Sequence, residues 1–195
     1  HQAVKLSVDG MNYRRIARHL DVDHKTVINW VNAYVAQLPS AAVPEDVYNA
    51  EMDELFTFIG SKKRVYLMTI VDRTTSCILA WAVEPHREQE ALQQMVDNAP
   101  QAAFYFSDLF ATYRNLIYTP GLYTPVPGKA ETYRVEGDNA EIRHYLARLA
   151  RRSRCFSRCI KALRRAIRLF VYAWNARQLY RHTYPNYPAH LIQFL

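Results

Sequence analysis

The chain has 195 residues, of which half are hydrophobic, 13% are aromatic and five are glycine. This composition fits one ordinary domain plus a small one, and it excludes a disordered, collagen-like or low-complexity chain. No apolar run approaches the roughly 18 residues that span a bilayer, and no charged-then-apolar leader opens the sequence, so we expect neither membrane insertion nor secretion. Three cysteines are too few for a disulfide framework and fit a reducing compartment.

Charge is distributed unevenly along the chain, whose formal net charge is +7. Residues 51–140 hold 12 acidic and 8 basic side chains, whereas residues 141–195 hold 12 basic side chains and one acidic side chain. Carboxylates gathered in the middle can hold divalent cations, and an arginine-rich end suits phosphate contacts. The distribution predicts a nucleic-acid partner, although a solvated basic face is the simpler alternative.

Residues 1–39 are predicted to form a helix-turn-helix DNA-binding domain. Three helical patterns run from Gln2 to about Val8, from Tyr13 to Leu20 and from His24 to Leu38, and Asp23 is a good N-cap for the third. The buried face of the third helix is predicted to carry Val27, Trp30, Val31 and Tyr34. Its exposed start is expected to contact DNA through His24, Lys25, Thr26 and Asn29. Because this segment has no net charge, a three-helix bundle that does not bind DNA remains an alternative.

Residues 40–49 are predicted to be a linker, and residues 50–195 an α/β catalytic domain with a basic C-terminal helix. The pattern predicts three antiparallel strands, a crossover helix, a parallel strand, a short helix, a fifth strand and a further helix. Their predicted ranges are 51–60, 64–72, 76–83, 88–98, 102–108, a short piece after 108, 122–126 and a helix opening at 136. This order, β-β-β-α-β-α-β-α, is typical of an RNase H-like mixed sheet.

Two aspartates are predicted to converge on this sheet. Asp53 lies inside an apolar strand, where a carboxylate is costly without a partner or metal, and Asp108 ends the fourth strand. Glu136 opens the helix after the fifth strand, with Asn139 and Arg143 expected on its face, so it can meet the aspartates. Spacing alone leaves three other acidic residues open as the third ligand: Asp72, Asp138 and Glu141.

The chain end is predicted to be one long helix from residue 157 to about residue 180. One face is apolar, for packing on the sheet or on a second subunit, and the other carries five basic residues: Arg158, Lys161, Arg164, Arg165 and Arg168. We expect the DNA backbone to be contacted by Arg151, Arg152, Arg158, Lys161 and Arg165.

Four segments resemble the DDE transposases of bacterial insertion sequences, closest to the insertion sequence one family. They are EMDE at 51–54, SD at 107–108, VEGDNAEIR at 135–143 and YLARLARRSRCFSR at 145–158. The last two are the most specific, since the family shows a Glu, an Asn three later, an Arg seven later, a basic stretch and a Phe-Ser pair. Leu109 and Phe110 depart from the family, which usually has Gly and an aromatic there. The family's N-terminal zinc ribbon is absent, so we expect a front-truncated chain.

The resemblance implies a transposase that cleaves and transfers DNA strands at insertion-sequence ends. Asp53, Asp108 and Glu136 would hold two Mg²⁺ or Mn²⁺ ions, Arg143 would contact a phosphate near the scissile bond, and Asn139 is also expected to contact DNA. The expected partners are double-stranded DNA, as terminal inverted repeats and target, and further copies of the chain assembled on the ends. The expected location is the bacterial cytoplasm, at the nucleoid. Two alternatives are a ribonuclease or junction resolvase on the same fold, and a catalytically silent DNA-binding fragment that represses the element.

Overall fold

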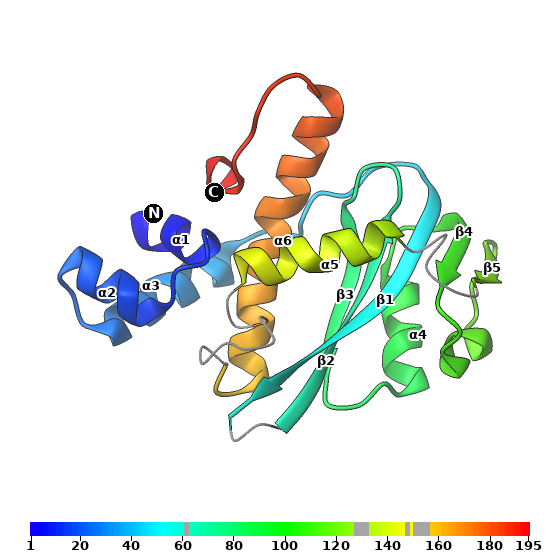
Figure 1. The fold of residues 1–195 in the computed structure, drawn as a ribbon, viewed down its shortest axis with the longest axis horizontal. Coiled ribbons are helices and arrows are strands. Elements are labelled where there is room, and N and C mark those ends of the chain that lie inside the picture. Colours follow the sequence, from blue (N-terminus) through cyan, green and yellow to red (C-terminus); the bar gives the residue numbers. More distant parts are fainter. Residues whose placement is uncertain (61–62, 127–132, 147–148, 150–156) are drawn as a thin grey trace.

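The computed structural model describes residues 1–60, 63–126, 133–146, 149 and 157–195, without the side chains of residues 133–136 and 138. It holds a small helical region and a mixed sheet flanked by helices (Figure 1). Among the described residues, no helix is both long and apolar enough to cross a bilayer.

The helical region consists of α1 (Gln2–Val8), α2 (Tyr13–Leu20) and α3 (His24–Gln37), as predicted. Side-chain oxygens begin the second and third helices, because Asn12 and Asp23 accept backbone N–H groups that the helices leave unpaired. Gly10, with φ of +90°, reverses the chain between α1 and α2 in a conformation that side chains with a Cβ rarely adopt.

The sheet has five strands in the spatial order β3-β2-β1-β4-β5. Their bounds are β1 (Val47–Ile59), β2 (Lys63–Asp72), β3 (Ile78–Glu84), β4 (Ala102–Ser107) and β5 (Leu122–Pro125). The first three strands are antiparallel, whereas β4 runs parallel to both β1 and β5. This arrangement confirms the predicted RNase H-like layout. The helical piece between β4 and β5 is a short 3₁₀ helix, η1 (Ala111–Asn115).

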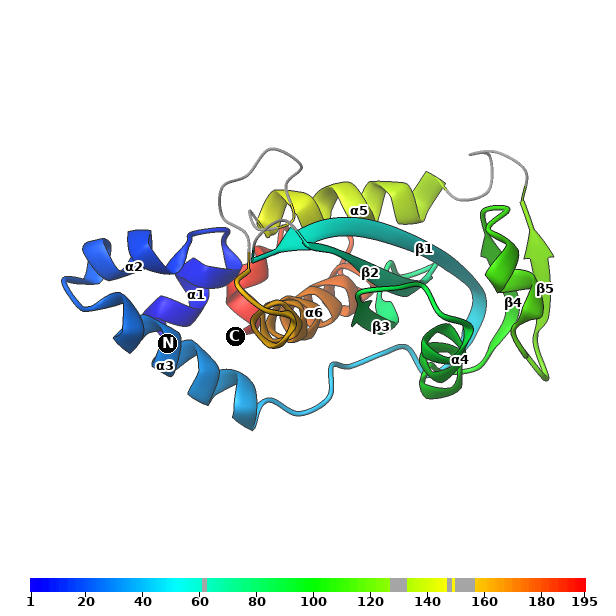
Figure 2. The same cartoon turned by 90° about the horizontal axis from the view of Figure 1, so that it is seen from below.

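Helices cover both faces of the sheet. One face packs under α4 (Gln89–Asn98) through residues such as Met52 and Met68. The opposite face packs under α5 (Tyr133–Tyr145) and α6 (Ile160–Thr183) through residues such as Leu55 and Leu67. Figures 1 and 2 both show α5 lying along β1, which brings the predicted catalytic helix next to the strand that carries Asp53.

The N-terminal helical region shares its hydrophobic core with the helices that cover the sheet. One cluster of buried residues continues from Val4 and Val31 in the helical region to Ile142 on α5 and Trp174 on α6. Polar contacts fix the connecting segment as well, since Arg168 donates to the Leu38 carbonyl and Asn175 to the Ala42 carbonyl. The chain ends in a 3₁₀ helix, η3 (Leu191–Phe194), which packs against α6.

Three details differ from the sequence-based expectations. Helix α5 begins at Tyr133, one turn before Glu136, so Glu136 lies within its first turn rather than opening it. Asn139, which we expected on the face of Glu136 and in contact with DNA, is 3% exposed. Trp30 is 47% exposed instead of facing the core, because Val27, Val31 and Val35 already fill the buried stripe of α3.

Candidate metal and DNA site

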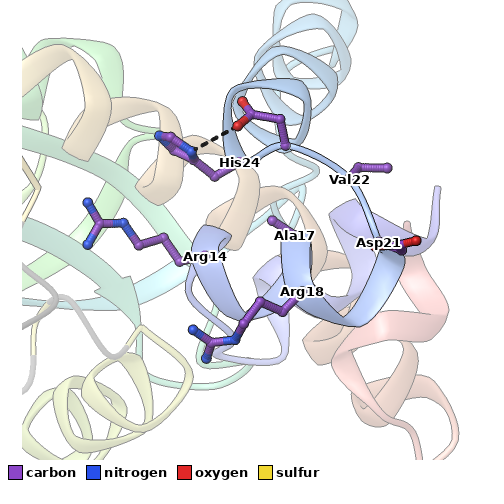
Figure 3. Close-up of a pocket in the computed structure, with 7 residues that line it drawn as sticks. Arg14, Ala17, Arg18, Asp21, Val22 and His24 are labelled. Atoms are coloured by element: carbon purple, nitrogen blue, oxygen red, sulfur yellow. Dashed lines mark ion pairs between the residues drawn. The ribbon is translucent and has the colours of Figure 1, made fainter.

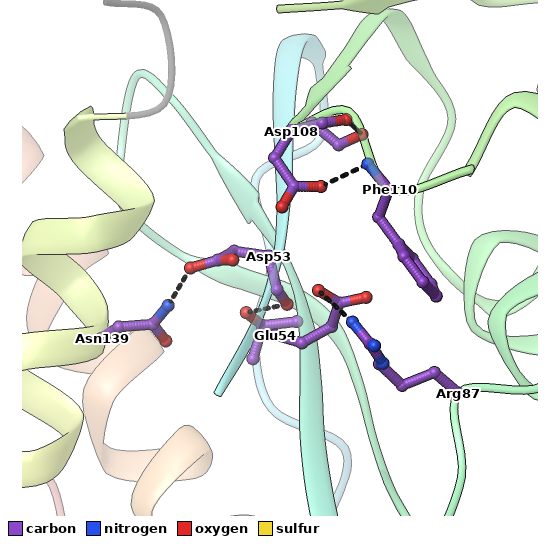
Figure 4. Close-up of polar contacts among 8 residues, drawn as sticks. Asp53, Glu54, Arg87, Asp108, Phe110 and Asn139 are labelled. Carbon is purple, nitrogen blue, oxygen red and sulfur yellow. Dashed lines mark hydrogen bonds and ion pairs between the residues drawn. The ribbon is translucent and has the colours of Figure 1, made fainter. Parts of the chain in front are cut away.

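The register of β1 and β4 places Asp53 and Asp108 side by side. The parallel ladder between these strands ends at the pair Met52–Ser107, so the next residue on each strand is one of the two aspartates. Neighbouring strands lie about 4.8 Å apart, which is close enough for two carboxylates to share a ligand. The prediction that these two strands are neighbours is therefore confirmed. Figure 4 shows the side chains of both aspartates at this end of the sheet.

A side chain of α5 forms a hydrogen bond with Asp53. The side-chain amide of Asn139 donates from Nδ2 to Asp53 Oδ2 at 2.6 Å (Figure 4). This bond joins residues 86 positions apart and fixes the helix to the strand. The structure thus gives Asn139 a carboxylate partner inside the protein, where the sequence had predicted a DNA contact.

Asp108 is oriented by its own loop. Its Oδ1 accepts the Phe110 backbone N–H at 3.0 Å, and its side chain is exposed. The ring of Phe110 is in turn covered by the Arg87 guanidinium, which lies 3.9 Å from the ring centroid. Arg87 also lies over the Tyr66 ring and 3.9 Å from Glu54 Oε2. One arginine therefore links the Asp108 loop to β1 and β2.

Glu54 is a buried carboxyl that the sequence reasoning did not select. Its side chain is 6% exposed, and Oε1 has no hydrogen-bond partner among the described residues. Burial raises the pKa of Glu54 to about 7; the Tyr113 hydroxyl and Arg87 oppose the rise, while the charges of Asp108 and Asp53 add to it. The sequence did indicate this residue, because Glu54 lies next to Asp53 within the largely apolar segment 52–58.

An ion pair next to Asp53 joins Glu51, two residues earlier on β1, to Arg73, which directly follows β2. Arg73 Nε donates to Glu51 Oε1 at 2.6 Å, and Glu51 is 1% exposed. The Arg73 guanidinium also lies 4.4 Å from the Phe106 ring centroid on β4. This pair ties β1, the β2 end and β4 together next to the aspartates, and the sequence analysis did not anticipate it.

The predicted third ligand, Glu136, lies on α5 one turn before Asn139, but its side chain is outside the described residues. Of the alternatives, Asp72 accepts two bonds from Thr75 and serves the turn after β2, at a position paired with Ala50 rather than Asp53. Glu141 is exposed on α5, and the Asp138 side chain is also outside the described part. Within the described side chains, which exclude Glu136, no three His, Cys, Asp or Glu groups assemble into a metal site.

Comparison with known proteins decides the family. Residues 47–176, about two thirds of the chain, match the family described as IS1 transposase, and residues 1–39 match the homeodomain-like domain. The chain belongs to the IS1 transposase family. It is also similar to "Insertion element iso-IS1n protein InsB" of Shigella dysenteriae, with 28% identity over 123 residues that cover 62% of this chain and 92% of the relative. The resemblance found in the sequence is confirmed.

In this IS1-family chain, the start of α3 presents polar side chains to solvent. Lys25 and Asn29 are exposed, while His24 and Thr26 are half-buried. His24 lines a shallow hollow together with Arg14 and Arg18 of α2 (Figure 3). These two arginines, four residues apart and exposed, were not predicted as DNA contacts, although their spacing places them on one helix face.

The basic residues of α6 divide into structural and exposed groups. Arg164 donates to the Val83 carbonyl and pairs with Glu84, and Arg168 donates to the connecting segment, so both hold α6 in place. Lys161 is exposed and Arg165 is half-buried, and Arg158, which precedes α6, is also exposed. Arg143 is half-buried on α5, and Arg151 and Arg152 are outside the described residues.

Proposed function

We propose that this protein is a transposase that cuts and joins DNA strands at the ends of its insertion sequence, using divalent cations held by Asp53, Asp108 and Glu136. The observation that carries the proposal is the β1–β4 register, which puts Asp53 beside Asp108 at the end of a parallel strand. The family and the adjoining helix-turn-helix support DNA as the substrate. A protein acting on a bacterial insertion sequence would work in the cytoplasm, at the nucleoid.

The residues fit the cation that the family implies. Asp53, Asp108 and Glu136 offer only carboxylate oxygens, which suit Mg²⁺ or Mn²⁺ better than zinc. The Asn139 side-chain oxygen beside Asp53 is buried without a hydrogen-bond donor among the described residues, as expected for a group that would face the hydration shell of a bound cation. When bound, two such ions would supply charge neutralisation at the attacking and leaving oxygens.

The chain's own groups would position the DNA. Exposed Lys25 and Asn29 on α3 would read the element end in the major groove, and Arg14 and Arg18 would contact its backbone. Exposed Lys161 on α6 and exposed Arg158, which precedes α6, would hold the DNA strand that reaches this end of the sheet. Since both ends of an element must be held together, we expect a homo-oligomer on DNA.

The test is cleavage of supercoiled DNA that carries the source element's ends, in Mg²⁺ or Mn²⁺. Asp53→Asn, Asp108→Asn and Glu136→Gln should each lower the cleavage rate at least about 100-fold, because loss of a metal ligand removes several kcal/mol of transition-state stabilisation. The matched control is Glu141→Gln, which makes the same chemical change at an exposed site on α5 and should leave the rate unchanged. End binding with no cleavage, unaltered by all four variants, would indicate a DNA-binding repressor instead.

A further inference from the structure

Asn139 makes a contact that its expected role in DNA binding does not explain. It is 3% exposed, and it reaches across from α5 to Asp53 with a hydrogen bond of 2.6 Å. A side chain this buried cannot contact a DNA backbone unless α5 moves off the sheet. Its position next to a predicted metal ligand points to another function.

The orientation of the Asn139 amide follows from its partner. An ionised carboxylate only accepts hydrogen bonds, so the NH₂ group must face Asp53 and the oxygen must point away from it. That oxygen, Oδ1, is buried and has no hydrogen-bond partner among the described residues. An unpaired buried acceptor destabilises the folded chain, and a bound ligand that donates a hydrogen bond to it would remove that penalty.

Packing alone is a poor account of this residue. Ile142 and Leu146 already bury the same helix in the core. A leucine at position 139 would fill similar space without leaving a polar atom unpaired. The amide is therefore better explained by what it does for Asp53 and for a polar ligand beside it.

We propose that Asn139 is a positioning residue of the metal site, which fixes the Asp53 carboxylate through Nδ2 and would accept a hydrogen bond through Oδ1 from a water in the hydration shell of the cation. This inference rests on the proposed function, since it requires a divalent cation at Asp53. Groups that orient a metal ligand in this way typically change metal affinity or activity 10- to 100-fold when removed.

The first test measures Mn²⁺ affinity by electron paramagnetic resonance on the full chain, with and without a DNA duplex of the element end. Asn139→Ala and the similarly branched but apolar Asn139→Leu should each weaken Mn²⁺ binding about 10- to 100-fold. Glu141→Gln, exposed on the same helix, should leave the affinity unchanged. DNA binding in EDTA should stay within twofold of the wild type for every Asn139 variant.

The second test is rescue by metal. Because the Asn139 variants retain Asp53 and Asp108, raising the Mn²⁺ concentration about 10- to 100-fold should restore much of their cleavage rate, which loss of folding or of DNA contacts would not allow. Both tests use only variants whose circular dichroism spectrum matches that of the wild type. If Asn139→Ala does not fold, Asn139→Leu takes its place in both tests.

The outcomes separate the two proposals. If Asp53→Asn abolishes Mn²⁺ binding while both Asn139 variants bind normally, the metal site stands and the role of Asn139 is refuted. If the Asn139 variants lose DNA affinity in EDTA with unchanged Mn²⁺ affinity, the residue is a DNA contact and the inference is wrong. If no Mn²⁺ site in the wild type depends on Asp53, the proposed function fails and the inference fails with it.

Discussion

The Glu54 carboxyl should make the stability of this protein depend on pH. Its pKa is raised from 4.5 to about 7 in the folded chain, mainly by burial. Between these values the folded state binds a proton that the unfolded state has lost, so the free energy of unfolding falls as pH rises through this window. Below about pH 4.5 the group contributes no penalty, and above about pH 7 the penalty is complete.

The magnitude follows from the shift. One pKa unit corresponds to about 1.4 kcal/mol, so the rise from 4.5 to about 7 costs the folded state up to about 3 kcal/mol at pH 8. Glu54→Gln keeps the shape of the side chain without its charge. We expect this variant to be more stable than the wild type by about 1–3 kcal/mol at pH 8, and to differ little from it at pH 4.5.

Urea unfolding in EDTA at pH 4.5, 6 and 8 measures this difference, with EDTA removing cations that would bind nearby carboxylates. Glu45→Gln is the control, because Glu45 is exposed and the chemical change is identical. Its stability relative to the wild type should stay constant across the three pH values. If Glu54→Gln destabilises the chain equally at pH 4.5 and pH 8, burial does not penalise the charged form and the reasoning is refuted.

Three further predictions test other contacts. Arg87→Met should slow cleavage at least about 10-fold with end affinity retained, measured by parallel nicking and gel-shift titrations, because Phe110 and the Asp108 loop lose their cation. Gly10→Ala should lower the free energy of unfolding by about 1–2 kcal/mol in urea, since its Cβ would lie 3.2 Å from the Tyr145 carbonyl at a φ of +90°. Lys25→Ala should reduce by about one the slope of log affinity against log salt if it contacts a phosphate; an unchanged slope would exclude that contact.

The local elements were predictable from the sequence because their causes are local. Asn12 and Asp23 cap the helices that follow them, and alternating apolar runs set the strands to within a few residues. The order of elements also predicted which strands are neighbours. The convergence of Asp53 and Asp108 follows from that order, since it needs only a parallel pairing of β1 with β4.

The tertiary structure decided which side chains are buried and which residues of distant elements they contact. Helical spacing placed Asn139 on the Glu136 face of its helix, toward the aspartates, but only the packing of α5 along β1 shows that Asn139 is buried and donates to Asp53. The burial of Glu54 was decided at the same level, because it depends on Arg87 and on the segment after β4 closing over the side chain. A sequence fixes the spacing of side chains along an element, whereas their partners depend on packing between elements that are distant in the chain.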